Sequence, residues 1–461
     1  MPHQQDSASF RDPSGFVYRA DGVLYRQVNA SYGADYEQLM TSGLYRALVG
    51  NGWLVSHEEV EPTRGAWRTL RPEVVPYVSY PYEWAFSQLK DAALLTLDIQ
   101  LLALKHGMTL KDASAYNVQF IGSRPVFIDT LSFERYQDGS PWIAYRQFCQ
   151  HFLAPLALTS RVDPRLRRMQ AAFIDGVPLD LASRQLPLRT WMRPGLATHI
   201  HLHARSQQRH QAAGRDLQPV KARQISKALL VALVDGLRRT VSGCRMPAAT
   251  TEWGDYYDDT NYTAEAMSAK ESLVAQMVDA LAPAGGIVHD LGANTGRFSR
   301  IVAESGRYVV AHDIDELAVE RHYLHNRSNR VPRVLPLLLD LTNPSPSLGW
   351  ASHERASAIE RIAGGTVVAL ALVHHLAISN NVPLPQLASF FAQVARELVV
   401  EFVPKDDSQV RRLLATRQDV FPDYTIEGFE RAFAAAFAVE RREAVTGSTR
   451  VLYAMRRRAS S

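Results

Sequence analysis

Short apolar runs alternate with helix-like stretches from about residue 285 to residue 457. The runs are rich in valine, leucine and isoleucine and too short for helices, which is typical of buried parallel strands. The stretches between them repeat apolar residues at helical spacing. This alternation predicts an α/β domain with helices on both faces of a parallel sheet. The predicted strands are 286–291, 308–312, 334–339, 367–373 and 398–403, and the predicted helices are roughly 297–305, 315–327, 351–362 and 385–396.

A β-hairpin is predicted at the end of this region. FAVERREAV (437–445) and TRVLYAMRR (449–457) both read as strands, and Thr-Gly-Ser separates them. Short polar segments that contain glycine are typical of tight connections between antiparallel strands. The hairpin is expected to give the parallel sheet an antiparallel edge.

The N-terminal half has a different pattern. An apolar helix is predicted at about 88–106, ending at Gly107, and the short strands VQFIG and PVFID follow. Since 461 residues exceed what one compact core usually holds, we expect two domains: an α+β domain at 1–240 and an α/β domain at 250–461.

Composition is that of a soluble globular protein, with 46% apolar and 21% charged residues. The start of the chain lacks the pattern of a secretory signal, and the longest apolar run, VVALALV, is far short of a membrane span. We therefore expect a cytoplasmic protein with no membrane partner. Cys149 and Cys244 are the only cysteines, and their spacing supports neither a disulfide framework nor a metal site.

The net charge of +4 is too small to argue for a nucleic-acid partner, but the charge is unevenly distributed. Residues 161–250 contain 16 lysines and arginines against 5 aspartates and no glutamate. Such a stretch is suited to an anionic partner, and a solvated basic face or linker would have the same composition.

Three acidic residues follow three successive predicted strands. The first strand leads into Asp290-Leu-Gly292-Ala-Asn-Thr-Gly296, Asp313 follows the second, and Asp340 follows the third. Ligands of open parallel sheets lie beyond the carboxyl ends of the strands, where the strand order reverses. Glycines permit a sharp turn there, an acid after the second strand can accept both ribose hydroxyls, and a third acid can accept from an adenine amino group. The spacing is neither the G-x-G-x-x-G of dinucleotide sites nor that of a P-loop.

On the segments DLGANTG, AHDID and LLLDLT, the C-terminal third resembles the class I methyltransferases that use S-adenosylmethionine. This resemblance implies a Rossmann-like, seven-stranded domain with an antiparallel edge hairpin. It also implies that the glycine loop lies against the methionine part of the cofactor, with Asp313 at the ribose and Asp340 beside the adenine. The implied cofactor-binding residues are Asp290, Gly292, Ala293, Asn294, Gly296, Asp313, Ile314, Asp340 and Leu341.

Candidate catalytic residues follow the fourth predicted strand, in ALALVHHLAISNN. His374 or His375 could remove a proton from a methyl acceptor near neutral pH. Alternatively, one histidine caps the strand and the other packs beneath it. The chain lacks the [DN]-P-P-[YFW] stretch of amino-group methylases of nucleic acids, which argues against such a substrate. Upstream, Tyr256, Tyr257 and Tyr262 could cover the cofactor, and Lys270 could reach a carboxylate.

A second constellation is Asp112, Asn117 five residues later, and Asp129 twelve residues after that. This spacing resembles the catalytic loop and metal-binding acid of protein-kinase-like phosphotransferases, and implies a kinase-like or pseudokinase domain that could bind ATP and Mg²⁺. Two features depart from that family: no glycine-rich phosphate loop is clear, and Arg26 stands where a lysine is expected. The alternative is an unrelated domain in which these residues form turns and end a strand.

His199, His201 and His203 alternate in THIHLHAR, as ligands on one face of a strand would. Since no carboxylate or cysteine lies nearby in the sequence, a helix or a solvated segment is the preferred interpretation.

The whole chain resembles bacterial methyltransferases that include rhizobial host-specific nodulation proteins. This resemblance implies a glycan or another small molecule as the methyl acceptor. We therefore expect an S-adenosylmethionine-dependent methyltransferase. The alternatives are a non-catalytic cofactor-binding scaffold with a pseudokinase half, and a bifunctional kinase and methyltransferase.

Overall fold

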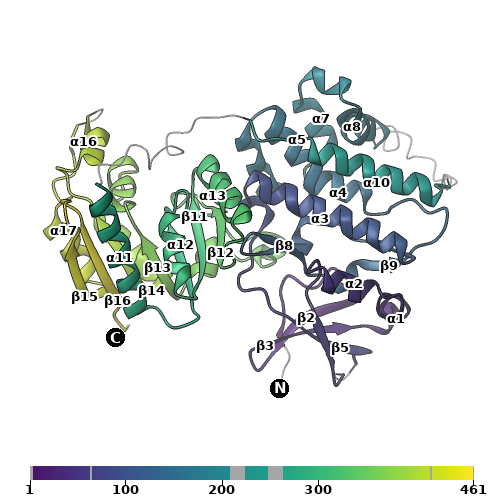
Figure 1. Ribbon diagram of the computed structural model, residues 1–461, viewed down its shortest axis with the longest axis horizontal. Coiled ribbons are helices and arrows are strands. Elements are labelled where there is room, and N and C mark those ends of the chain that lie inside the picture. Colours follow the sequence, from purple (N-terminus) through teal and green to yellow (C-terminus); the bar gives the residue numbers. More distant parts are fainter. Residues whose placement is uncertain (1–3, 63–64, 208–223, 248–262, 416–417, 460–461) are drawn as a thin grey trace. The chain divides into compact units, whose positions relative to one another are not determined.

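The structure is a computed structural model that describes residues 4–62, 65–207, 224–247, 263–415 and 418–459 (Figure 1). Its internal contacts divide the chain into two compact units. The N-terminal unit comprises Met1–Ala248 and Leu348–Arg355, and the C-terminal unit comprises Ala249–Ser347 and Ala356–Ser461. The sequence did not predict that Leu348–Arg355 belongs to the first unit.

The N-terminal unit begins with a five-stranded antiparallel sheet in the order β1-β2-β3-β5-β4. Asp21 and Gly22 both have positive φ angles, which suits the tight turn between β2 and β3. Helices α1 and α2 connect β3 to β4. The bounds are β1 Gln4–Gln5, β2 Gly15–Ala20, β3 Val23–Val28, α1 Gly33–Thr41, α2 Leu44–Gly50, β4 His57–Val60 and β5 Arg68–Pro72.

The rest of this unit is built around the buried helix α3 (Phe86–Lys105), which ends before Gly107, a residue with a φ of 73°. The helix predicted at 88–106 is therefore confirmed, as are the two short strands after it. α10 (Lys227–Ser242) packs along α3. No helix in the described residues is both long and apolar enough to cross a lipid bilayer. The other elements are β6 Met108–Leu110, β7 Val118–Ile121, β8 Arg124–Phe127, β9 Phe133–Arg135, α4 Tyr145–Phe148, α5 Ala154–Arg161, α6 Met169–Ala172, α7 Leu179–Gln185 and α8 Pro194–Leu196.

The C-terminal unit holds a seven-stranded sheet in the order β12-β11-β10-β13-β14-β16-β15. Its first five strands are parallel, and β16 and β15 form the antiparallel edge hairpin that the sequence predicts (Figure 1). The chain runs outward from β10 to β12 and then returns to β13 on the other side of β10. The strand order therefore reverses at β10 and β13, where open parallel sheets bind ligands. The strands are β10 Ile287–Leu291, β11 Tyr308–Asp313, β12 Val334–Leu338, β13 Gly365–Ala369, β14 Ala395–Phe402, β15 Phe437–Ala444 and β16 Val451–Arg457.

Successive residues of the central strands point to opposite faces and supply two separate cores. Val367 and Val400 pack with α14, α15 and α17 on one face, whereas Val368 and Val399 pack with α11 and α12 on the other. A strand buried on both faces reads as a continuous apolar run, which explains the pattern in the sequence. The helices are α11 Ala264–Leu281, α12 Arg297–Glu304, α13 Glu316–Ser328, α14 Ala358–Ile362, α15 Leu384–Val394, α16 Ser408–Leu414 and α17 Ile426–Ala434.

Two predicted elements are wrong in their bounds. The helix expected at 351–362 is only α14, because Ser357 and Glu360 form a capping box that starts the helix there. The strand expected at 367–373 ends at Ala369, because Ala371 adopts a φ of 48° and its N–H donates to the Glu401 carboxylate instead of to the sheet.

Candidate active site

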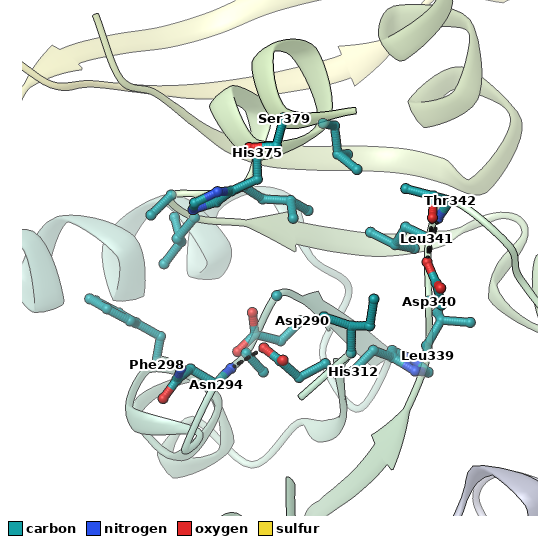
Figure 2. A pocket seen from close by; sticks show the side chains of 18 of the residues that line it. Asp290, Asn294, Phe298, His312, Leu339, Asp340, Leu341, Thr342, His375 and Ser379 are labelled. Carbon is teal, nitrogen blue, oxygen red and sulfur yellow. Dashed lines mark hydrogen bonds between the residues drawn. The ribbon is translucent and has the colours of Figure 1, made fainter. Parts of the chain in front are cut away.

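The turn after β10 is tied to the end of β11 by backbone hydrogen bonds. The N–H groups of Gly292 and Ala293 both donate to the His312 carbonyl at 2.9 Å. The next N–H, of Asn294, donates to Asp313 Oδ2 at 2.7 Å (Figure 2). Gly292 has a φ of 80°, which a glycine adopts without strain. The turn is therefore fixed to the carboxylate that the sequence assigns to the cofactor.

Gly296 is required for a reason that the sequence does not reveal. Its φ is 76°, and a Cβ atom there would lie 1.9 Å from Nε2 of His322 in α13. Gly296 does not line the pocket described below. The lack of a side chain lets the buried His322 ring pack against the turn, and contact of Gly296 with the cofactor stays a prediction.

The three predicted carboxylates differ in their surroundings. Asp313 accepts the N–H groups of Asn294 and Asp315, and Asp290 accepts the Ser299 hydroxyl at 2.6 Å. Burial raises the pKa of Asp290 to about 6 and that of Asp313 to about 6. Asp340 accepts the N–H and the hydroxyl of Thr342 (Figure 2).

These residues line one cavity of about 320 Å³ at the carboxyl ends of the strands. This volume falls within the range of about 300–1,000 Å³ that is usual for small-molecule sites. Phe298, His312, Leu339 and Leu341 contribute apolar and aromatic surface (Figure 2). Of the predicted cofactor and catalytic residues, those that line the cavity are Asp290, Gly292, Ala293, Asn294, Asp313, Ile314, Asp340, Leu341 and His375.

The two candidate catalytic histidines are placed differently. His375 lines the cavity, at the start of the π-helix His375–Ser379. Burial, with a smaller contribution from Arg450, lowers its pKa to about 4, so the imidazole is neutral at pH 7. His374 is completely buried, does not line the cavity, and has no hydrogen-bond partner for either ring nitrogen within the described structure. His374 therefore fits the alternative interpretation from the sequence, in which one of the two histidines packs beneath the strand.

A buried group of four charged residues borders the cavity and was largely missed from the sequence. Lys270 and Arg450 line the cavity, and Lys270 Nζ donates to Glu401 Oε2 at 2.7 Å. Arg450 donates to both oxygens of Asp407 at 2.8 and 3.2 Å. The carboxylate that Lys270 reaches is thus one of the protein itself. A glutamate inside the apolar run LVVEFV was the signal that could have revealed this pair.

Because the pKa of Asp313 is about 6, we predict that binding of an adenosyl ligand weakens in mild acid. A carboxylate accepts hydrogen bonds from two ribose hydroxyls, whereas the protonated acid must donate one itself. Ionisation is complete above the pKa and is lost as the pH falls through it. The affinity for S-adenosylhomocysteine, measured by calorimetric titration, should fall about tenfold between pH 7 and pH 5. A constant affinity over this range would contradict the role of Asp313.

The second predicted constellation also comes together, within the N-terminal unit. Asn117 is hydrogen-bonded to Asp112 and, through Nδ2, to the Ser132 hydroxyl, which in turn donates to Asp129. Arg26 of β3 forms an ion pair with Asp129 at 2.5 Å. Burial raises the pKa of Asp112. Both aspartates also accept a backbone N–H two residues ahead, as turn-forming residues do, so both interpretations from the sequence stay open.

The histidine triplet lies in a helix, as preferred, and not in a strand: it spans the π-helix Ala197–Leu202 and the residue after it. His199 bonds to the Tyr145 hydroxyl, and His201 to the hydroxyls of Ser183 and Thr190. No group of three or more potential metal-ligating side chains occurs in the described residues. Tyr256, Tyr257 and Tyr262 lie outside the described residues.

Comparison with known proteins finds a relative that matches nearly the whole chain. The chain is 38% identical to the nodulation protein NoeA of Rhizobium meliloti (strain 1021) over 461 residues, which cover 98% of this chain and 96% of that protein. No protein-family model matches the chain.

Solved structures match parts of the chain at low identity. The N-methyltransferase NodS of Bradyrhizobium japonicum WM9, bound to S-adenosylhomocysteine, is 12% identical, covers 46% of this chain and 94% of its own, and has a TM-score of 0.32. Magnesium protoporphyrin IX methyltransferase of Synechocystis PCC 6803 is 18% identical. The match covers 45% of this chain and 93% of that protein and has a TM-score of 0.31. WbdD, in complex with a kinase inhibitor, is 15% identical. The match covers 44% of this chain and 43% of that protein and has a TM-score of 0.31. TM-scores this low do not by themselves establish a shared fold.

Proposed function

The chain belongs to the family of the nodulation protein NoeA, and we propose that it is an S-adenosylmethionine-dependent methyltransferase with a small-molecule or glycan-like acceptor. One observation carries the proposal. The glycine turn after β10, Asp313 after β11 and Asp340 after β12 all line one cavity where the strand order reverses. This arrangement is suited to a ligand with a ribose and an adenine ring.

The residues of the cavity fit the parts of this cofactor. Asp313 would hold the ribose, Asp340 and Leu341 would border the adenine, and the backbone at Gly292 and Ala293 would lie against the methionine part. The Leu372 side chain lies close to this turn, since a Cβ atom at Gly292 would be 3.3 Å from it. When bound, the cofactor supplies an electrophilic methyl group. The protein has to align the acceptor, exclude water and, for an oxygen acceptor, remove a proton.

His375 is the residue that we propose for proton removal. Its ring lines the cavity and is neutral at pH 7, so it can accept a proton, although burial makes it a weaker base than an exposed histidine. His375→Ala should lower kcat by about 10²–10⁴-fold while the affinity for S-adenosylhomocysteine stays near that of the unchanged protein. Ser379→Ala, which alters another residue of the cavity wall, serves as the control. Turnover unchanged in His375→Ala would remove the histidine as the base.

The acceptor can be identified by transfer of a labelled methyl group. The full-length protein, incubated with methyl-labelled S-adenosylmethionine and a cell extract, should label a small molecule or glycan that is then isolated and characterised. Asp313→Ala should abolish the label. Label found only in nucleic acid or protein would contradict the proposed class of acceptor, and tight cofactor binding with no labelled product would favour the non-catalytic scaffold.

A second candidate function is phosphoryl transfer, or nucleotide binding without transfer, in the N-terminal unit. The convergence of Asp112, Asn117 and Asp129 favours it. If the cluster binds Mg²⁺ and ATP, their joint addition should raise the melting temperature, and Asp129→Ala should remove the effect. If Mg²⁺ and ATP raised the melting temperature of Asp129→Ala by the same amount, or did not raise that of the unchanged protein, these residues would have only a structural role.

A further inference from the structure

A second cavity lies within the N-terminal unit, and none of the residues that line it belongs to the cluster around Asp129. Its volume is about 520 Å³, which is within the usual range for small-molecule sites. The wall is formed by the end of α5, the segment around α8, the π-helix Ala197–Leu202 and the last turns of α10. No function proposed above uses this cavity.

Three arginines line this cavity: Arg161, Arg193 and Arg239. No aspartate or glutamate is among the described residues of its wall, and no ion pair is found for any of the three within the described part of the chain. The Nε atom of Arg161 is buried and has no hydrogen-bond partner there. By contrast, Arg238, the neighbour of Arg239, is paired with Asp98 at 2.7 Å. Among the described residues, the arginines of the cavity are thus positive charges without a paired acid.

A fourth cation offsets the negative end of α10. Lys90 Nζ donates to the carbonyl oxygens of Ser242 and Cys244, at 2.8 and 2.9 Å. These carbonyls lie at the carboxyl end of α10, whose partial negative charge would otherwise repel an anion. Burial raises the pKa of the Cys244 thiol, and the nearby Arg161, Lys90 and Arg193 oppose that rise. Positive charge therefore converges on this part of the wall.

The remaining polar groups of the wall add no negative charge. Burial lowers the pKa of His199 to about 4, so its ring is neutral at pH 7, and its Nδ1 is bonded to the Tyr145 hydroxyl. The Thr240 hydroxyl donates to the Gly236 carbonyl and keeps its capacity to accept. Three of the 16 lysines and arginines in 161–250 thus line one cavity.

We propose that this cavity binds the phosphate group of a small phosphorylated molecule, with Arg161, Arg193 and Arg239 as its ligands. Guanidinium groups are planar donors that match two phosphate oxygens at once. Three like charges around one cavity repel each other, and a dianion relieves that repulsion. The volume accommodates a ligand about the size of a sugar phosphate.

The test is calorimetric titration of the full-length protein with glucose 1-phosphate, inorganic phosphate, sulfate and glucose at a fixed ionic strength. We expect the two phosphates to bind and glucose not to. Arg193→Gln/Arg239→Gln should weaken the binding of glucose 1-phosphate by about 100-fold, about tenfold for each charged hydrogen-bond donor removed. Both side chains are exposed, and their loss relieves repulsion, so the double variant should melt no lower than the unchanged protein.

The matched control is Arg168→Gln/Arg189→Gln. It removes the same charge from exposed positions of the same unit that do not line the cavity, and it should bind within about threefold of the unchanged protein. Three outcomes would overturn the proposal. They are no binding of either phosphate at millimolar concentration, equal weakening in the control variant, or sulfate binding as tight as that of phosphate, which would mean that the cavity selects charge alone.

Discussion

Asp313→Ala is expected to weaken the binding of S-adenosylhomocysteine by about 10²–10⁴-fold. In the proposed complex the carboxylate accepts hydrogen bonds from two ribose hydroxyls, and each hydrogen bond to a charged group contributes about 1.5–3 kcal/mol. The same carboxylate holds the N–H groups of Asn294 and Asp315, so its loss also loosens the turn after β10. Both effects act in the same direction.

Calorimetric titration at pH 8, where Asp313 is ionised, measures this loss. Asp340→Ala should cost only about tenfold, because that carboxylate already accepts two hydrogen bonds from Thr342 and would make a single contact to the adenine. Glu427→Ala, an exposed position in α17, removes an equal charge away from the cavity and should have no effect. Binding by a folded Asp313→Ala protein within threefold of normal would contradict the assignment of the cavity.

The cofactor residues could be predicted because they depend on local sequence order. In a parallel sheet each strand ends at the same edge, so residues such as Asp290, Asp313 and Asp340 meet once the strands are recognised. The apolar runs located those strands to within a few residues because each is buried on both faces. The local pattern at Asp112 and Asn117 was visible for the same reason: both lie in one short connection between strands.

The residues that the sequence did not reveal depend on contacts between distant segments. Glu401 is paired with Lys270, which lies 131 positions earlier in the chain, and no periodicity links the two. Gly296 was predicted only as part of the cofactor loop, and its close contact with the His322 ring of the next helix could not be foreseen. The three arginines of the second cavity come from three separate segments, and composition alone showed only that the region is basic.

The buried pair of Lys270 and Glu401 leads to the second large prediction. Both side chains are at most 3% exposed, and Glu401 also accepts the N–H of Ala371, a residue of the cavity wall. Glu401→Gln retains an oxygen for Ala371 but leaves the lysine ammonium buried without its counter-charge. Removing one partner of such a pair typically destabilises a protein by about 3–5 kcal/mol. We expect a loss of this size in the C-terminal unit.

Hydrogen exchange of the β14 amides as a function of urea measures that loss in the unit concerned, while hydrogen exchange of the α3 amides reports on the N-terminal unit, which should be unaffected. Lys270→Met/Glu401→Gln removes both charges and should recover much of the stability, because no buried charge is then left uncompensated. Glu440→Gln breaks an exposed pair with Arg456 and should cost less than about 1 kcal/mol. If the double variant were no more stable than Glu401→Gln, the lysine charge would not be the cause of the loss, and the hydrogen bond to Ala371 would have to account for it.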